Sequence, residues 1–261
     1  MGRFFVYIYT MLAHYGLIGY PLQHSFSPAY FKKKFAASNI NAVYDLYPIE
    51  SITEFRSLLA AHPDLKGLNV TTPYKEAVIP YLDEIDAVAA EMGAVNCIVI
   101  REGKTKGYNT DATGFEKSLN PLLMPQHTSA LILGTGGSSK AVAYALTQLG
   151  IPFHKVSRHK TDHVFCYDEL SAEVVSYYKL IINTTPTGMY PNVDHVPPFP
   201  FQHVGDHHLL FDLIYNPEET KFLAMGKERG AVSKNGFEML QLQAEASWDI
   251  WNQGAESEDP E

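Results

Sequence analysis

Short apolar runs with little internal alternation succeed one another along the chain, separated by helical patterns, and no other feature restricts the fold as much. Such runs are typical of strands that helices cover on both faces, as in parallel sheets. The cycle runs through the first half of the chain and restarts near Ala130. The alternation therefore predicts the α/β class, with two α/β domains and mostly parallel sheets.

The expected elements can be placed by residue number. Strands are expected at 15–19, 42–49, 65–71, 95–101, 130–133, 153–157, 180–185, 209–215 and 231–235. Helices are expected at 28–39, 51–61, 74–92, after Asp111, at 138–149 and at 237–251. Ser27, directly before Pro28, and Ser51 are candidate N-caps, because a serine oxygen can accept a free N–H of the first turn.

Composition narrows the class of partner. The chain has 261 residues, 46% of them apolar, and a formal net charge of −9. A surplus of negative charge argues against nucleic acid or a membrane as the main partner, because both reward a basic face. Cys97 and Cys166 are the only cysteines. No disulfide framework is implied, and the cytoplasm is the expected compartment.

Both ends of the chain are expected to lie outside the folded domains. We interpret residues 1–10 as an extension ahead of an alternative start at Met11. A secretory leader is the second interpretation, which the short apolar run and the lack of a clear cleavage site disfavour. Residues 256–261 are acidic and contain no apolar side chain, which predicts a disordered tail.

A glycine-rich loop connects the apolar run at 130–133 to the helix expected at 138–149. Gly134, Gly136 and Gly137 allow a tight turn, and the helix N-terminus offers free N–H groups to a pyrophosphate. Ser139 stands where the usual dinucleotide motif has glycine or alanine. Because strand, loop and helix occur in the required order, a dinucleotide site is favoured over a plain turn.

The end of the next expected strand indicates which dinucleotide binds. NAD sites usually carry an acidic residue about 20 residues after the first glycines. Arg158 and Lys160 occupy this region instead, and no acid follows before Asp162. A guanidinium can bind a 2′-phosphate bidentately. The sequence therefore favours NADP, with a solvated basic turn as the alternative.

Polar side chains gather near the carboxyl ends of the expected strands in the first half, where α/β sheets bind ligands. Each one alone has an ordinary structural explanation, as a helix cap or as an amide that satisfies loop backbone. Together they supply hydroxyls, amides, one ammonium and one carboxylate, which suit a small polyhydroxylated anion. They are Ser25, Ser27, Asn69, Thr71, Lys75, Asn96 and Asp111.

With these motifs in place, the chain resembles shikimate dehydrogenases from Tyr15 to Trp251. The matching segments are SFSP, NVTTPYK, GAVN, YNTDATG, GTGGSSKA, INTTPTGM, DLIYNP, SKNGFEML and LQAEASW. The resemblance implies NADP-dependent, reversible reduction of 3-dehydroshikimate to shikimate, on the path to aromatic amino acids. It also implies a substrate-binding domain at 1–112, to which 237–261 return, and a Rossmann-like NADP-binding domain at 113–236.

The resemblance assigns a role to each matching residue. Lys75 and Asp111 would be the catalytic pair. The substrate carboxylate would contact Ser25, Ser27 and Tyr215, and the ring hydroxyls would contact Asn69, Thr71, Asn96 and Gln243. The cofactor would contact Gly134, Gly136, Gly137, Ser138, Ser157, Arg158, Asn183, Thr184 and Gly236. Leu240, Gln243 and Ser247 share one face of the last expected helix.

Two details depart from the pattern of the family. Ser157-Arg158-His159 stands where Asn-Arg-Thr is frequent, which bears on the strength of the preference for NADP. Ser138 and Ser139 stand where the glycine loop often carries alanine, a change that the loop should tolerate.

The sequence leaves two roles open for Lys75. An ammonium near the ketone oxygen stabilises the developing alkoxide and can also donate the proton. Lys75 is therefore either the proton donor or chiefly an electrostatic and positioning group.

Two other functions compete with this one. The first is an NAD-dependent quinate/shikimate dehydrogenase of the same family, and the second is a dinucleotide-binding regulator without catalysis. Retention of Ser25 and Arg158 disfavours the first, and retention of Lys75 and Asp111 disfavours the second. A monomer or homodimer is expected, without a metal.

Overall fold

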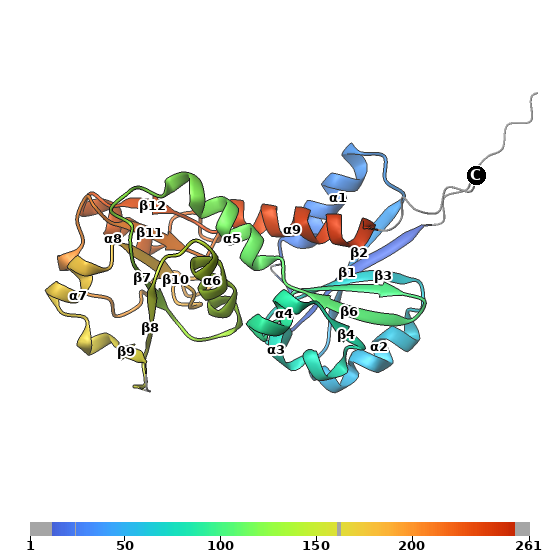
Figure 1. The fold of residues 1–261 in the computed structure, drawn as a ribbon. Helices are drawn as coiled ribbons and strands as arrows, with labels where there is room; N and C mark the ends of the chain where they lie inside the picture. Colours follow the sequence, from blue (N-terminus) through green and yellow to red (C-terminus); the bar gives the residue numbers. More distant parts are fainter. Residues whose placement is uncertain (1–11, 24, 161–162, 254–261) are drawn as a thin grey trace, which may run out of the picture. The chain divides into compact units, whose positions relative to one another are not determined.

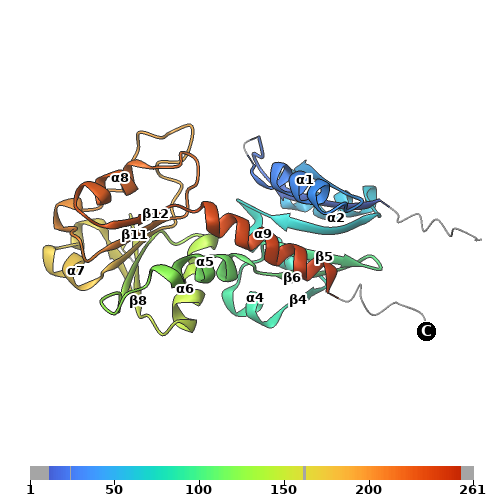
Figure 2. The same cartoon turned by 90° about the horizontal axis from the view of Figure 1, so that it is seen from above.

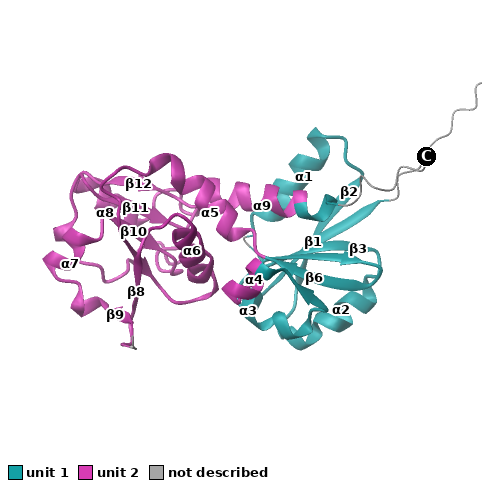
Figure 3. Cartoon of the chain, in the orientation of Figure 1, with its two compact units in different colours: residues 1–87, 95–108, 250–261 teal, residues 88–94, 109–249 magenta. Residues whose placement is uncertain are grey.

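The computed structural model describes residues 12–23, 25–160 and 163–253. The extension expected at 1–10 and the tail expected at 256–261 lie outside these residues. By its internal contacts the chain divides into two compact units, which Figure 3 shows in different colours. The first comprises residues 1–87, 95–108 and 250–261, and the second comprises residues 88–94 and 109–249.

The first unit contains a six-stranded sheet in the order β2-β1-β3-β5-β6-β4. β1 pairs in parallel with β2 and β3, whereas β5 runs antiparallel to β3 and to β6. The expectation of parallel pairing therefore fails at β5, and the sheet is mixed. The strands are β1 (Ala13–Gly19), β2 (Ala42–Pro48), β3 (Leu65–Val70), β4 (Glu84–Ile85), β5 (Cys97–Arg101) and β6 (Lys104–Tyr108).

A tight hairpin between β5 and β6 makes this sheet mixed. Arg101 pairs with Lys104, so the loop contains only Glu102 and Gly103. Their φ angles are 51° and 74°. Positive φ at both central residues is the geometry of a type I′ turn, whose twist matches that of the strands it connects.

The helices of the first unit are short, and two expectations about them are wrong. They are α1 (Ser27–Ala37), η1 (Ile52–Glu54), α2 (Phe55–Ala61), α3 (Tyr74–Ala77) and η2 (Ile79–Tyr81). The helix expected at 74–92 is interrupted by η2 and β4 and resumes as α4 (Ala87–Met92). Ser27 is the first residue of α1 and not its cap, whereas Ser51 forms the expected cap as part of a capping box with Glu54.

Aromatic rings form much of the core of the first unit. Phe31 stacks on Tyr44 with a centroid distance of 4.5 Å, and Tyr15 stacks on Trp251 at 4.8 Å. The indole N–H of Trp251 donates to the Ile98 carbonyl at 3.0 Å. A Cβ at Gly67 would lie 2.3 Å from that indole nitrogen. The end of α9 (Phe237–Asn252) therefore returns to the first sheet, as expected.

The second unit contains a six-stranded sheet in which every pairing is parallel, in the order β12-β11-β10-β7-β8-β9. Counted from β7, this is the order 3-2-1-4-5-6 of dinucleotide-binding sheets. The Rossmann-like domain is thus confirmed. The strands are β7 (Ala130–Leu133), β8 (Phe153–Ser157), β9 (Val164–Cys166), β10 (Leu180–Asn183), β11 (Leu209–Asp212) and β12 (Val232–Lys234).

Helices cover both faces of the second sheet. Successive residues of a strand point to opposite faces, so alternate residues of β7 pack against different helices. Ala130 and Ile132 belong to a core with α5 (Asp111–Leu119) and α6 (Gly137–Gln148), which lie side by side in Figures 1 and 2. Leu131 and Leu133 belong to a core with α7 (Ala172–Tyr177) and α8 (Lys221–Glu228). The short 3₁₀ helices are η3 (Asn120–Leu122), η4 (Tyr167–Glu169) and η5 (Phe201–His203).

The division by contacts differs in detail from the expected functional domains. It groups α9 up to Asp249 with the second unit and only the residues from Ile250 with the first. The expected boundaries at 112 and 237 stay a prediction. In the described part of the chain, no helix combines the length and the apolar character needed to cross a membrane.

Candidate active site

Of the two serines of the predicted site, Ser25 lies between β1 and α1 and Ser27 is the first residue of α1. Ser25 is partly buried and donates its backbone N–H to the Leu22 carbonyl at 3.1 Å. Ser27, at the start of α1, is only 8% exposed. Its hydroxyl hydrogen-bonds to Tyr44. Burial raises the pKa of Tyr44 well above its ordinary value, and the hydrogen bond from Ser27 opposes this shift.

Asn69 and Asn96 meet where β3 ends beside the start of β5. The Asn69 amide is held at both ends, because Oδ1 accepts from the Tyr44 hydroxyl at 2.8 Å and Nδ2 donates to the Asn96 carbonyl at 3.2 Å. Both asparagines are buried. Through Tyr44 the structure therefore brings together Ser27, Asn69 and Asn96, three residues that the sequence predicts for one site.

Lys75 follows β3 after a short connection and lies in the single turn of α3. The backbone of this turn is fixed, because Val95 N–H donates to the Lys75 carbonyl at 2.7 Å and Tyr74 N–H donates to the Thr71 carbonyl at 2.9 Å. The Tyr74 hydroxyl also donates to the Ile49 carbonyl at 2.7 Å. Thr71 and Lys75 thus occupy defined positions at the carboxyl end of β3 in the first unit.

Asp111 is the first residue of α5 in the second unit and is only 6% exposed. The side chain of Asn109 accepts hydrogen bonds from the N–H groups of Asp111 and Ala112, at 3.0 and 3.3 Å. The side chain of Asn109, and not that of Asp111, accepts the hydrogen bonds from the free N–H groups at the start of this helix. The explanation of Asp111 as a simple N-cap is therefore wrong.

Gln243 lies on α9 and is connected to the start of α5 within the second unit. Thr110, which precedes Asp111, donates to Gln243 Oε1 at 3.4 Å and hydrogen-bonds with Ser247 at 3.1 Å. Gly114 allows this contact, because a Cβ there would lie 2.6 Å from the Met239 carbonyl oxygen. The expected shared face of Gln243 and Ser247 is confirmed, and it packs against α5.

The glycine loop follows β7 and has the properties that a pyrophosphate requires. Gly134 has a φ of +111°, and a Cβ there would lie 2.7 Å from Thr184 Oγ1. At Gly136, in contrast, a Cβ would meet no protein atom within 4 Å. Gly136 precedes α6 without a side-chain cap, so N–H groups of the first turn of α6 are open to a ligand. This geometry fits the expected dinucleotide.

The turn after β8 contains Ser157 and Arg158. Ser157 Oγ accepts the His159 N–H at 3.3 Å, which shapes the turn. Arg158 is exposed and lies near Tyr167, where its charge opposes the effect of burial, which raises the pKa of Tyr167 to about 12. Lys160 instead forms an ion pair with Glu169. Of the two basic residues, Arg158 is therefore the better match to a 2′-phosphate.

Three further predicted residues lie at the ends of β10 and β11 or border them. Asn183 is fully buried, and its amide nitrogen donates to Asp212 at 3.0 Å. Thr184 Oγ1 donates to the Leu133 carbonyl at 2.7 Å, which fixes it beside the glycine loop. At Gly236 a Cβ would lie 2.1 Å from the Leu213 carbonyl oxygen, so packing alone demands glycine there.

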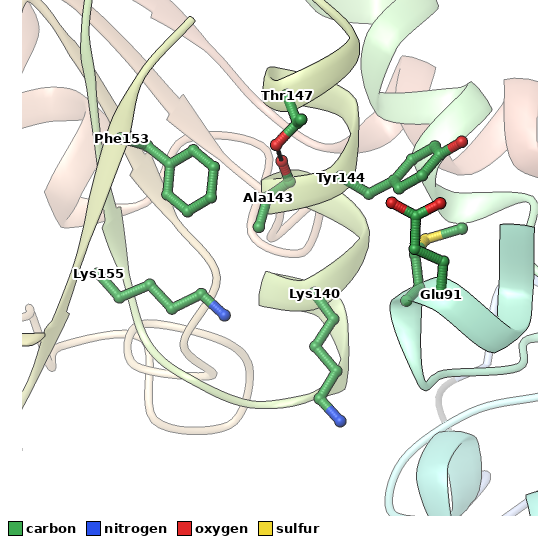
Figure 4. Close-up of a pocket in the computed structure, with 8 residues that line it drawn as sticks. Glu91, Lys140, Ala143, Tyr144, Thr147, Phe153 and Lys155 are labelled. Carbon is green, nitrogen blue, oxygen red and sulfur yellow. Dashed lines mark hydrogen bonds between the residues drawn. The ribbon is translucent and has the colours of Figure 1, made fainter. Parts of the chain in front are cut away.

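A separate cavity of about 220 Å³ opens between α6 and β8 in the second unit. Figure 4 shows Phe153 and Lys155 facing Thr147 and Lys140 across it. None of the residues that line it is a predicted site residue. The candidate active site is therefore not this cavity.

Sequence reasoning missed three residues that organise the site. They are Tyr44, Asn109 and Asp212. Tyr44 lies within β2, Asn109 lies two residues before Asp111, and Asp212 is the last residue of the buried strand β11. Only Asp212 carried a signal, because a carboxylate at the end of an apolar strand is costly unless it has hydrogen-bond donors.

The fold and these residues define a two-domain α/β protein with a polar ligand-binding unit and a dinucleotide-binding unit. Residues 17–98 match the family model described as the shikimate dehydrogenase substrate binding domain. The chain is 39% identical to the shikimate dehydrogenase (NADP(+)) of Halothermothrix orenii, over 90% of this chain and 89% of that one. It belongs to the shikimate dehydrogenase family.

Solved structures of relatives have the same fold. Shikimate dehydrogenase from Aquifex aeolicus matches with a TM-score of 0.85 at 34% identity, covering 94% of both chains. Quinate dehydrogenase from Corynebacterium glutamicum in complex with NAD matches with a TM-score of 0.82 at 28% identity, covering 92% of this chain and 94% of that one. The expected family and fold are confirmed.

Proposed function

We propose that this protein is an NADP-dependent shikimate dehydrogenase that reversibly reduces 3-dehydroshikimate to shikimate in the biosynthesis of aromatic amino acids. Family membership over nearly the whole chain is the observation that carries the proposal. Retention of Lys75 and Asp111 supports a catalytic function over a regulatory one. Retention of Arg158 supports NADP as the cofactor.

The chemistry requires a group that controls charge at the ketone oxygen. The reduced nicotinamide supplies the hydride, and negative charge develops on the oxygen as the hydride arrives. The Lys75 ammonium stabilises this charge and is the proposed source of the proton. Asp111 is the proposed second catalytic group, which accepts a hydrogen bond from a substrate hydroxyl and orients it.

Substrate recognition is proposed to divide by chemical group. Ser25, Ser27 and Tyr215 bind the carboxylate. The ring hydroxyls are bound by Asn69, Thr71, Asn96 and Gln243. The hydrogen bond from the Tyr44 hydroxyl supports the proposed role of Asn69 in substrate binding, because it fixes the direction of the amide before any ligand binds.

Cofactor binding is proposed along the carboxyl edge of the second sheet. The glycine loop and Ser138 bind the pyrophosphate, and Ser157 and Arg158 bind the adenosine 2′-phosphate. Asn183, Thr184 and Gly236 border the ribose and nicotinamide. The open first turn of α6 supports this placement.

We further propose the functional domains at 1–112 with 237–261 and at 113–236. Two cysteines, neither in a disulfide, support a cytoplasmic location. A monomer or homodimer without nucleic acid or membrane as a partner is the proposed state.

The proposal is tested by measuring shikimate-dependent reduction of NADP with the purified protein. Activity with shikimate and NADP is expected, with a lower kcat/KM for NAD. Lack of turnover by folded protein that still binds NADP would favour the regulatory function instead.

An NAD-dependent quinate/shikimate dehydrogenase is the second candidate, because a quinate dehydrogenase shares the fold. The same assay with quinate and NAD separates the two. A higher kcat/KM for quinate and NAD than for shikimate and NADP would establish the second candidate.

A further inference from the structure

Asp212 is a fully buried carboxylate at the end of β11 that has no part in the chemistry proposed above. It accepts three hydrogen bonds. Oδ1 accepts from Asn183 Nδ2 and from the Ile214 N–H, both at 3.0 Å, and Oδ2 accepts from the Thr220 hydroxyl at 2.6 Å. Burial raises the pKa of Asp212 to about 6, and these three bonds oppose the shift. At neutral pH the residue is therefore a satisfied buried anion.

The first bond fixes the segment that follows β10. Asn183 uses its amide nitrogen on Asp212 and its amide oxygen on Thr185, whose N–H and hydroxyl donate to it at 3.1 and 2.7 Å. Thr184, between them, donates its hydroxyl to the Leu133 carbonyl and lies against Gly134. The orientation of a predicted ribose-binding segment thus depends on Asp212.

The second bond fixes the turn that leads to Tyr215. Ile214 donates its N–H to Asp212 and accepts from the Gly236 N–H at 3.0 Å. Leu213, the residue between, donates its N–H to the Asn183 carbonyl at 3.0 Å. The turn is therefore held by Asp212 itself and by the two residues that follow it.

The third bond fixes the start of α8. Thr220 is the N-cap of this helix, and its hydroxyl accepts the Leu223 N–H at 3.4 Å while donating to Asp212. The hydroxyl has one proton to donate, and Asp212 receives it. A single carboxylate therefore ties together three segments at the carboxyl edge of the sheet, where dinucleotides bind.

We infer that Asp212 is a positioning residue for hydride transfer, which holds the segments of Thr184 and Tyr215 in the geometry that the reaction needs. The inference rests on the proposed function. It adds a residue that contacts neither substrate nor cofactor and acts through Asn183, Ile214 and Thr220. A misplacement of about 1 Å can lower a rate on the order of 10²-fold.

The test is Asp212→Asn in the full chain, measured with shikimate and NADP. The amide keeps the shape and can retain the bonds from Asn183 and Ile214, but neutral hydrogen bonds are roughly half as strong as charge-assisted ones. We expect kcat per folded molecule to fall about tenfold or more while KM for shikimate changes less than about threefold. The kinetic isotope effect on kcat with shikimate deuterated at the reacting carbon should rise, because hydride transfer becomes the slow step.

A second pair of variants decides the matter if Asp212→Asn fails to fold. Thr220→Val removes the hydroxyl that donates to Oδ2, and Thr220→Ser retains it. We expect Thr220→Val to lower kcat and raise the isotope effect, and Thr220→Ser to restore both. Asp194→Asn is the matched control. This exposed aspartate contacts Lys221, the first residue of α8, at 2.9 Å, and its substitution should leave kcat unchanged.

The outcomes separate the two proposals. Wild-type protein without shikimate dehydrogenase activity would overturn the proposed function and this inference with it. An active wild type with an unchanged kcat and isotope effect in folded Asp212→Asn, or in Thr220→Val, would overturn the inference alone. A lower melting temperature with normal kcat per folded molecule would show a purely structural role and would also overturn it.

Discussion

The hydroxyl of Tyr44 donates a 2.8 Å hydrogen bond to Oδ1 of Asn69, and this contact fixes the direction of the asparagine amide. Nδ2 of the same amide donates to the Asn96 carbonyl. Ser27 also hydrogen-bonds to this tyrosine. One phenol that sequence reasoning did not select therefore connects three of the residues that it did.

Tyr44→Phe should weaken substrate binding without weakening cofactor binding. The variant leaves the buried Asn69 oxygen without this donor, at a cost of about 1–3 kcal/mol, and frees the amide to turn. We expect KM for shikimate to rise roughly tenfold, at about 1.4 kcal/mol per decade. Steady-state kinetics and NADP titration check this. Tyr47→Phe, on the same strand with its ring against His62, is the control and should resemble wild type.

Lys75→Met should lower turnover by a factor of order 10² or more, because the charge that stabilises the alkoxide is lost. Lys75→Ala should have the same effect on turnover. Folding and the Kd for NADP should be unchanged, as measured by thermal unfolding and titration. Lys66→Met, at an exposed position of β3, is the matched control. Near-normal turnover of Lys75→Met would remove this residue from the mechanism.

Arg158→Ala should discriminate between the two dinucleotides. A charge-assisted hydrogen bond to phosphate contributes about 1.5–3 kcal/mol, so Kd for NADP should rise roughly tenfold to a hundredfold. Kd for NAD should hardly change, because NAD lacks the 2′-phosphate. Lys160→Ala serves as the comparison and should have a smaller effect, since this lysine pairs with Glu169. An equal loss for NADP and NAD would refute the assignment of Arg158.

The sequence predicts the central strands of the second sheet better than some strands at or near the sheet edges, and the reason is physical. β7, β10 and β11 are buried at every residue and read as apolar runs. β9 is only partly buried, and the expected strands do not include it. β6 is polar at Lys104 and Lys106 and was not expected. The sequence signal for β6 is the two-residue turn at Glu102 and Gly103. This signal is weak, because the positive φ angles that define the turn are known only from the structure.

The site shows the same limit. Lys75 and Asp111 have side chains whose chemistry suggests a role directly. Tyr44 and Asp212 act on partners that are distant in sequence, and membership of the DLIYNP segment does not reveal the partners of Asp212. Tyr44 and Asn69 are 25 residues apart, and Asn183 and Asp212 are 29 apart. Such pairs are defined by strand order and register, which local patterns do not determine.

The buried Asp212 should also leave a mark on the pH dependence of stability. Its pKa is about 6 in the folded protein and near 3.8 without burial. Between these values the unfolded chain has lost the proton while the folded protein keeps it. The free energy of unfolding should therefore fall as pH rises from about 4 to about 6, by at most about 3 kcal/mol at 1.4 kcal/mol per pKa unit.

Urea unfolding of wild type and Asp212→Asn across this range isolates the effect. The difference between the two unfolding free energies should decrease from pH 4 to pH 6 and then become constant. A difference independent of pH would show that Asp212 titrates at its ordinary value in the folded protein.

Substrate choice should depend on Ser25 and Ser27, the two hydroxyls proposed for the carboxylate. Ser27 is nearly buried at the start of α1, so it has little freedom to move aside. Shikimate is flat at the ring carbon that bears the carboxylate, whereas quinate has a tetrahedral carbon with an extra hydroxyl. That hydroxyl should collide with the serine side chains or displace the carboxylate from them.

We therefore expect kcat/KM for shikimate to exceed that for quinate by a factor of order 10² or more, since a displacement of about 1 Å can cost this much. Ser25→Gly should narrow the gap, because it opens space for the extra hydroxyl while it removes one contact to shikimate. Ser38→Gly, at the residue that follows α1, is the control for the loss of a serine hydroxyl outside the site. Comparable wild-type efficiency on the two acids would show that these serines do not discriminate between them.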